Sequence, residues 1–354
     1  MAAGRVAWID YSKGIGIILV VMVYSAGVFG GADASGNWML GLAAWARPVV
    51  LPAFFLISGL FLRRSIFGSA ATYFDRKVLH LAYFFAIWLA IEAVFLNAGV
   101  IARSPLAFLS LYASGWIAPE SPLWFIHELA VFYIVTRLAR RLPANRVFIG
   151  AAVLQVLVTA GLFQTGWTVA DRFAAYYVYF FAGYAAVPVV FHYVRGIARR
   201  ANDITGVLAV WLAVHTAFVA MGIAGLPVVS LILGFAGTFA LIAGGALLSH
   251  LPAAQFIGYA GRNSLAVYLC FFIPVHVLHA VLTATGLIPD AGAASLATAV
   301  ASIALSLLAC RLALETPLRV LFVRPQILRF KAARSAQRGS LLSASIPTSS
   351  LPEL

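Results

Sequence analysis

The sequence predicts an all-α polytopic membrane protein, a single bundle of about ten transmembrane helices with both ends in the cytoplasm. Three observations predict this fold class. Of the 354 residues, 63% are hydrophobic and only 10% are charged, and the mean hydropathy of +0.98 lies beyond that of soluble domains. Apolar runs long enough to span a bilayer recur along the chain. The basic residues gather between these runs.

Hydropathy places the spans near residues 14–31, 39–62, 78–98, 122–138, 147–163, 172–192, 205–223, 227–248, 262–285 and 293–315. The first run could instead be a cleaved signal peptide. Asp10 is unusual before such a run and many spans follow, so we expect an uncleaved first span. The membrane domain is therefore expected over residues 1–318.

The connections between spans differ in charge. If the N-terminus is cytoplasmic, the inner connections hold most of the basic residues, such as Arg76, Lys77, Arg140 and Arg199, while the outer ones hold few. By the positive-inside rule, both termini then lie inside. The formal net charge of +13 is interpreted in the same way, so we expect no nucleic-acid partner.

Two segments lie outside the predicted spans. Residues 102–122 form the longest external connection, and their mixture of aromatic residues with Pro and Gly leaves two interpretations open: a re-entrant or interfacial helix, or a loop in the headgroup region. Residues 319–354 are basic and then Ser-rich, a composition that cannot bury a core. We expect them to form a disordered cytoplasmic tail against anionic lipid.

Ionisable side chains inside spans are candidate site residues because an unpaired charge in the bilayer is costly. Lys13 and Tyr24 are eleven residues apart, so at about 100° per residue they share one helix face, about 16 Å apart along the axis. A snorkelling lysine and a core tyrosine are the alternative. Arg76, Lys77 and His80 form a basic cluster that suits a phosphate-bearing ligand from the cytoplasm, or anchors the helix to the membrane surface.

Arg47 lies in the second span beside Pro48 and Pro52, which free backbone carbonyls and indicate a cavity. His127 and Glu128 lie near the outer end of the fourth span. Adjacent helical residues diverge by about 100°, so the two cannot face one point, although either could be a general base. Further candidates are Glu92, His215, His276 and His279.

Several familiar chemistries are not indicated. His276 and His279 share a helix face but have no third ligand nearby in sequence, so no metal is expected. Cys270 and Cys310 each lie in an apolar run, which excludes a CxxC motif and a disulfide framework. No P-loop, GxSxG, HExxH or dinucleotide fingerprint occurs.

Six stretches, in order, carry a family resemblance: WIDYSKGIGIILVVM, PAFFLISGLFLRR, YFDRKVLHLAYF, PLWFI, RFAAYYVYFFAGY and GRNSLAVYL. Through them the chain resembles the acyltransferase 3 family of bacterial inner-membrane O-acyltransferases, in the branch similar to fucose 4-O-acetylases. The resemblance covers nearly the whole chain. It implies a multi-pass protein of the bacterial inner membrane that transfers an acetyl or succinyl group from cytoplasmic acyl-CoA to a hydroxyl of an envelope or exported glycan.

The resemblance also implies roles for residues. The family's basic residue in the first span falls on Lys13, and the family's catalytic histidine, eleven residues on, falls on Tyr24. The basic pair that begins the third span falls on Arg76 and Lys77, with His80 one turn later. We therefore expect acyl-CoA to bind at Lys13, Arg76, Lys77 and His80, and a glycan or lipid-linked sugar to be the acceptor.

We assign catalysis to Tyr24, Lys13 and His127, and acceptor binding to the four residues Asp10, Arg47, Glu128 and Tyr268. A second departure from the family follows Tyr268, where many relatives have a histidine and this chain reads Cys270, Phe271, Phe272. No motif specifies the acceptor's identity or an oligomeric state.

Tyr24 changes the chemistry that the resemblance implies. Free tyrosine has a pKa of about 10 and free histidine about 6.5, so a neutral phenol is a poor general base. Tyr24 could donate a hydrogen bond to an oxyanion, or His127 or His80 could take the proton. Losing general-base help lowers a rate by about 10²- to 10⁴-fold. The leading hypothesis is a membrane O-acyltransferase, and the alternative is a catalytically degenerate relative that binds or transports a lipid-linked or acyl substrate.

Overall fold

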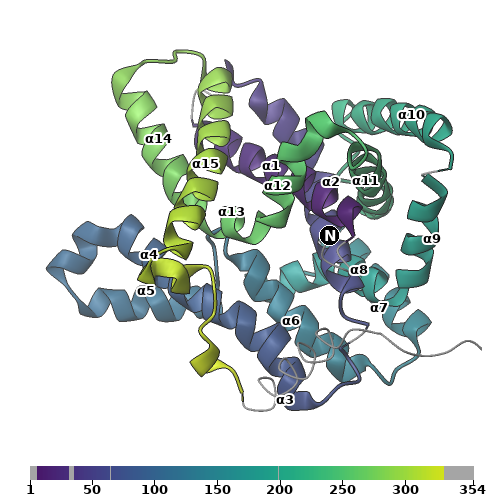
Figure 1. Ribbon diagram of the computed structural model, residues 1–354, viewed down its shortest axis with the longest axis horizontal. Coiled ribbons are helices and arrows are strands. Elements are labelled where there is room, and N and C mark those ends of the chain that lie inside the picture. The colour runs from purple at the N-terminus through teal and green to yellow at the C-terminus, as the bar shows by residue number, and fades with distance from the viewer. Residues whose placement is uncertain (1–5, 32–35, 64, 198, 331–354) are drawn as a thin grey trace, which may run out of the picture.

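The computed structural model describes residues 6–31, 36–63, 65–197 and 199–330, and within them every regular element is a helix (Figure 1). The predicted all-α fold class is therefore confirmed for these residues. The helices are α1 (Ala7–Val28), α2 (Met39–Leu60), α3 (Ala70–Tyr73), the π-helical turn η2 (Phe74–Val78), α4 (Leu79–Arg103), α5 (Leu106–Ile117), α6 (Trp124–Ala139), α7 (Ala144–Thr159), α8 (Thr168–Ala185), α9 (Val187–Ile197), α10 (Ala201–Ala220), α11 (Pro227–Leu248), η3 (Pro252–Ala254), α12 (Gln255–Arg262), α13 (Ser264–Cys270), α14 (Phe272–Thr285), α15 (Ala291–Leu314), η4 (Pro317–Leu321) and η5 (Gln326–Leu328).

Six to eight of the ten predicted spans are long and apolar enough to cross a membrane in the described residues. Each predicted run coincides with a helix, but in the described part of the chain six helices are long and apolar enough to cross a membrane: α1, α2, the continuous α3–α4 stretch, α10, α11 and α15. The bent pairs α8–α9 and α13–α14 bring the number to eight. Helices α6 and α7 have 16 residues each, short for a span. A bundle of ten spans and the cytoplasmic position of both ends stay predictions.

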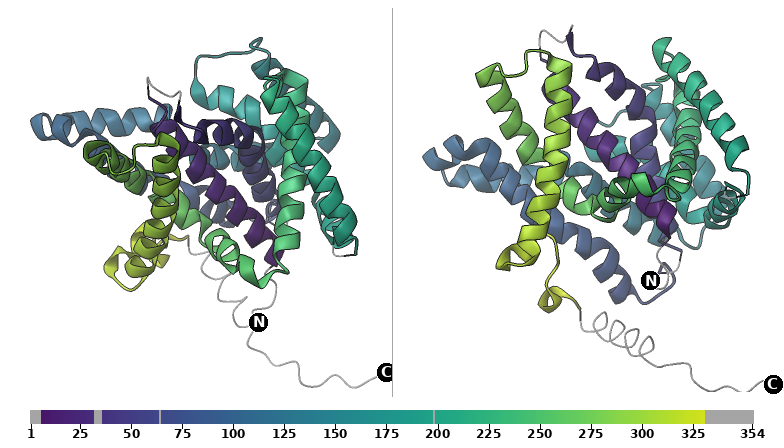
Figure 2. Two further views of the ribbon diagram at one scale, coloured as in Figure 1. Left: turned by 90° about the horizontal axis from the view of Figure 1, so that it is seen from above. Right: turned by 45° about the horizontal axis from the view of Figure 1, so that its top comes forward.

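Helix α1 lies in the middle of the bundle and packs against α2, α11, α12 and α15 (Figure 2). It begins at Ala7, well before the predicted residue 14, because Trp8 and Ile9 are buried in the core and extend the helix past the polar residues. The contact with α12 is close: a Cβ on Gly261 would lie 1.7 Å from the Asp10 carbonyl oxygen. Lys13 is therefore held inside the helix, two turns from its start.

Two predicted spans are each broken into a bent pair. Helices α8 and α9 meet at 74°, and α13 and α14 meet at 49°. Each break precedes a proline in the second or third position of the new helix, Pro188 in α9 and Pro274 in α14. Proline has no backbone N–H and its ring clashes with the carbonyl four residues earlier, so the helix bends there. The second bend directs α14 along α1.

Of the two interpretations of residues 102–122, the structure shows a helix and not a plain loop, while its re-entrant or interfacial position stays a prediction. Helix α5 packs back against α4 and forms a hairpin with it that extends from the bundle (Figure 1). Gly115 allows the close approach, because a Cβ there would lie 2.7 Å from the Leu89 side chain. The Tyr112 hydroxyl donates to the Ala86 carbonyl at 3.3 Å.

The chain after α15 packs against the start of α4. Arg324 forms an ion pair with Asp75 at 2.9 Å, and the two side chains are 5% and 2% exposed. Arg324 also donates to the Asp75 carbonyl oxygen at 2.8 Å. Tyr83 and Trp88 of α4 donate to the backbone carbonyls of η4. Residues 319–330 of the expected tail thus include groups that pack against α4 and η2, while residues 331–354 lie outside the described part of the chain, and the expectation of a disordered tail stays a prediction.

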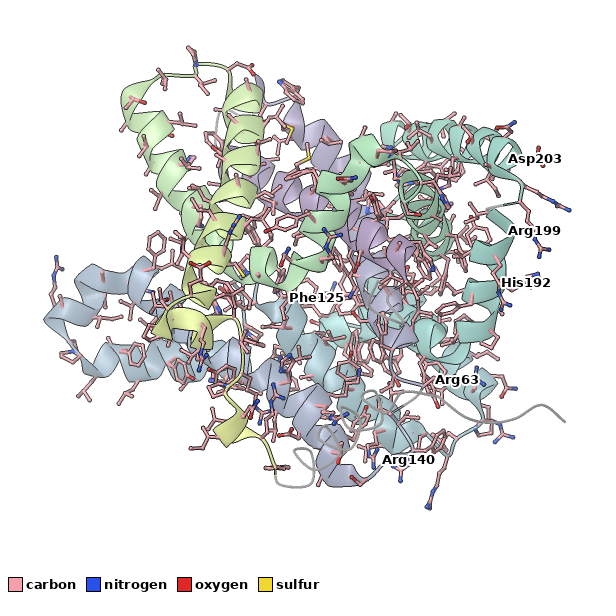
Figure 3. All side chains as sticks on the ribbon, in the orientation of Figure 1. Arg63, Phe125, Arg140, His192, Arg199 and Asp203 are labelled. Carbon is pink, nitrogen blue, oxygen red and sulfur yellow. The ribbon has the colours of Figure 1, made fainter. Side chains whose placement is uncertain are left out.

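Replacing Asp75 by alanine is expected to destabilise the fold by about 3–5 kcal/mol, because it leaves the buried guanidinium of Arg324 without its counter-ion. The expected signs are a lower melting temperature in detergent and faster proteolysis within residues 317–330. Asp203→Ala is the control, since Asp203 is exposed at the start of α10 (Figure 3). Equal melting temperatures for both variants would contradict a stabilising role for the ion pair.

Candidate functional site

A cavity of about 320 Å³ lies between α1, α2, α6 and α13. Its wall is mostly apolar, with Ile17, Val20, Phe54, Phe125 and Leu129 among the lining residues. The rings of Phe54 and Phe125 meet edge to face at 5.9 Å. Figure 3 shows Phe125 at the centre of the bundle. The cavity therefore lies inside the bundle and has an apolar middle.

Charged and polar groups lie at the two ends of this cavity. Helices α1 and α2 are joined by a short connection and pack against each other, so they run antiparallel along the wall. Lys13 of α1 and Ser58 of α2 line one end, while Tyr24 of α1 and Arg47 of α2 line the other. Lys13 and Tyr24 thus share one face of α1, as their spacing predicts.

The Lys13 end adjoins a second cavity of about 470 Å³, lined by Ser69, Thr72, Arg76 and Lys77 among others. Phe61 separates the two. The Lys13 ammonium lies over its ring, 5.1 Å from the centroid, and the Lys77 ammonium donates to its carbonyl oxygen at 3.4 Å. The two ammonium groups of Lys13 and Lys77 therefore both contact Phe61, and the Arg76 guanidinium lines the same second cavity, an arrangement that attracts anions.

The π-helical turn η2 presents this basic cluster. Arg76 and Lys77 both belong to its five residues, which precede the regular turns of α4. A π-helical turn inside an α-helix is rare and is frequent at functional sites. Lys77 also lies over the Tyr133 ring at 5.1 Å. His80, one turn later, lines neither cavity: its ring packs edge to face on Phe84 at 5.0 Å.

At the other end, the Tyr24 hydroxyl is 3.1 Å from Nε2 of His276, a residue of α14 that is 252 positions away in sequence. The Tyr24 ring packs against Phe271 and Phe272. Glu92 of α4 is buried and acts electrostatically on the Tyr24 phenol. The phenol and the imidazole thus lie within hydrogen-bonding distance, and the Glu92 carboxyl group acts on the phenol from α4.

Tyr268 of α13 also lines the cavity, and its hydroxyl donates to the Pro122 carbonyl oxygen. Glu120, which lines the cavity too, was not singled out from the sequence because it lies in a connection. Arg172 was likewise passed over. Its guanidinium lies over the ring of Trp124, 4.6 Å from the centroid, and donates to the Pro119 carbonyl at 2.5 Å.

Besides His80, three residues assigned to the site from the sequence line neither cavity. The His127 ring packs against Phe85 at 5.1 Å, between α6 and α4. Glu128 is 1% exposed and interacts electrostatically with Arg172 of α8. Asp10 lies in the first turn of α1, beside α12. The rotation of α6 directs His127 toward α4 and Glu128 toward α8, so neither side chain lines the cavity that holds Tyr24.

Comparison with known proteins gives one match. A family model described as an acyltransferase domain matches residues 6–314, which extend from the start of α1 to the end of α15. No curated protein and no solved structure matches the chain. The matched range contains both cavities and all the residues that line them.

Proposed function

Because the chain belongs to the acyltransferase 3 family, we propose that it is an O-acyltransferase that moves an acetyl or succinyl group from cytoplasmic acyl-CoA to a glycan hydroxyl. The observation that carries the proposal is the cavity with Lys13 at one end and Tyr24 with Arg47 at the other. A donor and an acceptor that approach from opposite faces of a membrane would meet in a cavity with polar groups at both ends. The family membership and the apolar helices support a multi-pass membrane acyltransferase in general.

The basic cluster suits the donor. Arg76 and Lys77 would hold phosphate oxygens in the second cavity, where the hydroxyls of Ser69 and Thr72 supply further donors. The thiol-bearing arm would pass Phe61 to reach Lys13 and the apolar middle of the main cavity. The thioester would then lie toward Tyr24. His80 is not part of this arrangement, since it lines neither cavity.

The Arg47 end suits the acceptor. Arg47 and Glu120 offer a donor and an acceptor for sugar hydroxyls, and Trp124 and Phe125 offer aromatic faces. Tyr268 lines the same region. We propose that a sugar of an envelope or exported glycan, free or lipid-linked, enters here, and that the protein works in the bacterial inner membrane with its basic end toward cytoplasmic acyl-CoA.

The proposal predicts CoA-dependent acylation of glycan. Membranes that carry the protein are incubated with radiolabelled acetyl-CoA or succinyl-CoA and with envelope glycan fractions. The label is expected to enter the glycan, and matched membranes without the protein are expected to leave it unlabelled. If no envelope fraction becomes labelled from either donor, the proposed function is wrong.

Tyr24 favours a second candidate function. Its phenol lines the cavity at the position where acyl transfer needs a general base, and a neutral phenol is a poor base. A degenerate family member would bind or transport a lipid-linked or acyl substrate through the same cavity. Tyr24→His separates the two functions. If the substitution creates transfer where the native chain has none, the native chain is degenerate, and if it lowers an existing transfer rate, Tyr24 has an adapted role in catalysis.

A further inference from the structure

The hydrogen bond between Tyr24 and His276 joins two helices that only the fold brings together. Helix α14 reaches α1 because of the 49° bend that follows α13, and His276 faces α1 one turn after this bend. The Phe272 ring packs against both members of the pair, 5.8 Å from the Tyr24 ring and 4.5 Å from the imidazole. The aromatic contacts therefore hold the phenol and the imidazole in position for their hydrogen bond.

The two side chains of the pair lie at different distances from the cavity. Tyr24 lines it and His276 does not, so the phenol stands between the cavity and the imidazole. Tyr268 is the useful contrast, because it lines the same cavity but donates to the backbone carbonyl of Pro122, a group that cannot take up a proton. Imidazole can, since its ordinary pKa is about 6.5.

We propose that Tyr24 and His276 form a proton relay for acyl transfer, in which Tyr24 is the catalytic residue and His276 is the positioning residue that accepts its proton. This inference rests on the proposed function. It assigns His276, on a different helix from the residues expected to act, as the source of basicity that a phenol alone lacks.

The proton balance of the step is complete. As the acceptor oxygen bonds to the acyl carbon, its O–H bond breaks and the proton passes to the Tyr24 oxygen. At the same time the phenolic proton passes to Nε2 of His276, which requires the tautomer protonated at Nδ1. The C–S bond then breaks and CoA leaves as a thiolate. The imidazolium returns the proton through Tyr24, which gives the ester and the CoA thiol.

Two other titratable groups act electrostatically on the pair, Glu92 on Tyr24 and His279 on His276. Glu92 from α4 acts electrostatically on both Tyr24 and Tyr268, and a negative charge there would favour an imidazolium over a phenolate. His279 lies one turn along α14 from His276, and its ring packs on Phe29 at 4.6 Å. His279 belongs to the same helix and environment but has no contact with Tyr24 among the described interactions, so it offers a matched control.

The test compares purified H276Q, Y24F and the control H279Q in the acetyl-transfer assay. H276Q and Y24F are each expected to lower kcat by about 10²-fold or more, with the KM for acetyl-CoA unchanged, because the cations that bind CoA remain. The double variant should lose no more than either single one, since both remove the same relay. H279Q should match the native chain. Native kcat should also fall on acidification, and H276Q should lack that fall.

A second experiment uses a variant that does not need His276. Y24H places an imidazole directly on the cavity wall, so adding H276Q to Y24H is expected to change kcat little. A native kcat and pH profile for H276Q overturn the relay, as does an additive loss in the double variant. If H276Q does not fold, Y24F decides: a kcat equal to that of the native chain overturns the proposal. Absence of any transfer by the native chain instead overturns the proposed function, and the relay with it.

Discussion

Replacing Gly183 by leucine is expected to prevent the bundle from folding. Gly183 lies where α8 crosses α2, and a Cβ there would lie 2.0 Å from the Leu56 carbonyl oxygen. The crossing is reciprocal, because a Cβ on Gly59 would lie 2.1 Å from the Phe180 carbonyl oxygen. Both obstacles are backbone atoms of helices, which cannot rotate away as a side chain can. Glycine is what allows two membrane helices to approach so closely.

Separation of these two helices would open the core on both sides of the crossing. Phe55 and Phe180 are fully buried beside it, and overpacking a well-packed core already costs about 1–3 kcal/mol when side chains can adjust. A backbone collision leaves less room to adjust. We therefore expect G183L to give little monodisperse protein in detergent and a melting temperature well below that of the native chain.

The matched control is Gly150→Leu. Gly150 lies in the interior of α7, is exposed, and a Cβ there would meet no atom within 4 Å. Leucine also favours the helix more than glycine does. G150L should therefore keep the native yield and melting temperature. If G183L and G150L had the same melting temperature, the α2–α8 crossing would tolerate a side chain, contrary to the geometry described above.

Replacing Lys13 by glutamine is expected to raise the KM for acyl-CoA by about 10- to 100-fold, since a hydrogen bond to a charged group contributes about 1.5–3 kcal/mol. The reason is the position of Lys13 at the junction of the two cavities, over Phe61. Lys13→Arg keeps the charge and should lose less. The measurement is the initial rate of acetyl transfer as a function of acetyl-CoA concentration.

Arg199→Gln is the control for Lys13→Gln, because it removes the same charge from an exposed position at the edge of the bundle (Figure 3). Its KM should equal that of the native chain. If Lys13→Gln and Arg199→Gln give the same KM, the cation at Lys13 does not contact the donor. A fall in kcat at unchanged KM would instead place Lys13 in the chemical step rather than in donor binding.

Composition and periodicity predict much of this molecule. Apolar runs near 39–62 and 227–248 became α2 and α11 almost residue for residue, because a helix in lipid must satisfy all its backbone groups internally. The helical period also placed Lys13 and Tyr24 on one face. The start of α1 and the α5 helix were less predictable, since both depend on packing against α12 and α4.

The sequence could not predict which side chains from distant helices contact each other in the bundle. His276 was a candidate without an assigned partner other than His279, because a helix repeat predicts neighbours three or four residues away and not a partner 252 residues away. His127 and Glu128 had the right chemistry for the site, yet the rotation of α6 directs them to α4 and α8. No pattern in the sequence predicts the Asp75–Arg324 ion pair, because it forms only where the chain after α15 packs against the start of α4.

The sequence by itself determined that the chain is a helical membrane protein and which runs became helices. These properties follow from local hydrophobicity and from backbone hydrogen bonding within each helix. Only the tertiary structure decided that Tyr24 meets His276 and that Arg47 and Glu120 line the cavity end to which Tyr24 belongs. Those contacts depend on bends at prolines and on glycine crossings, which set the rotation and tilt of each helix.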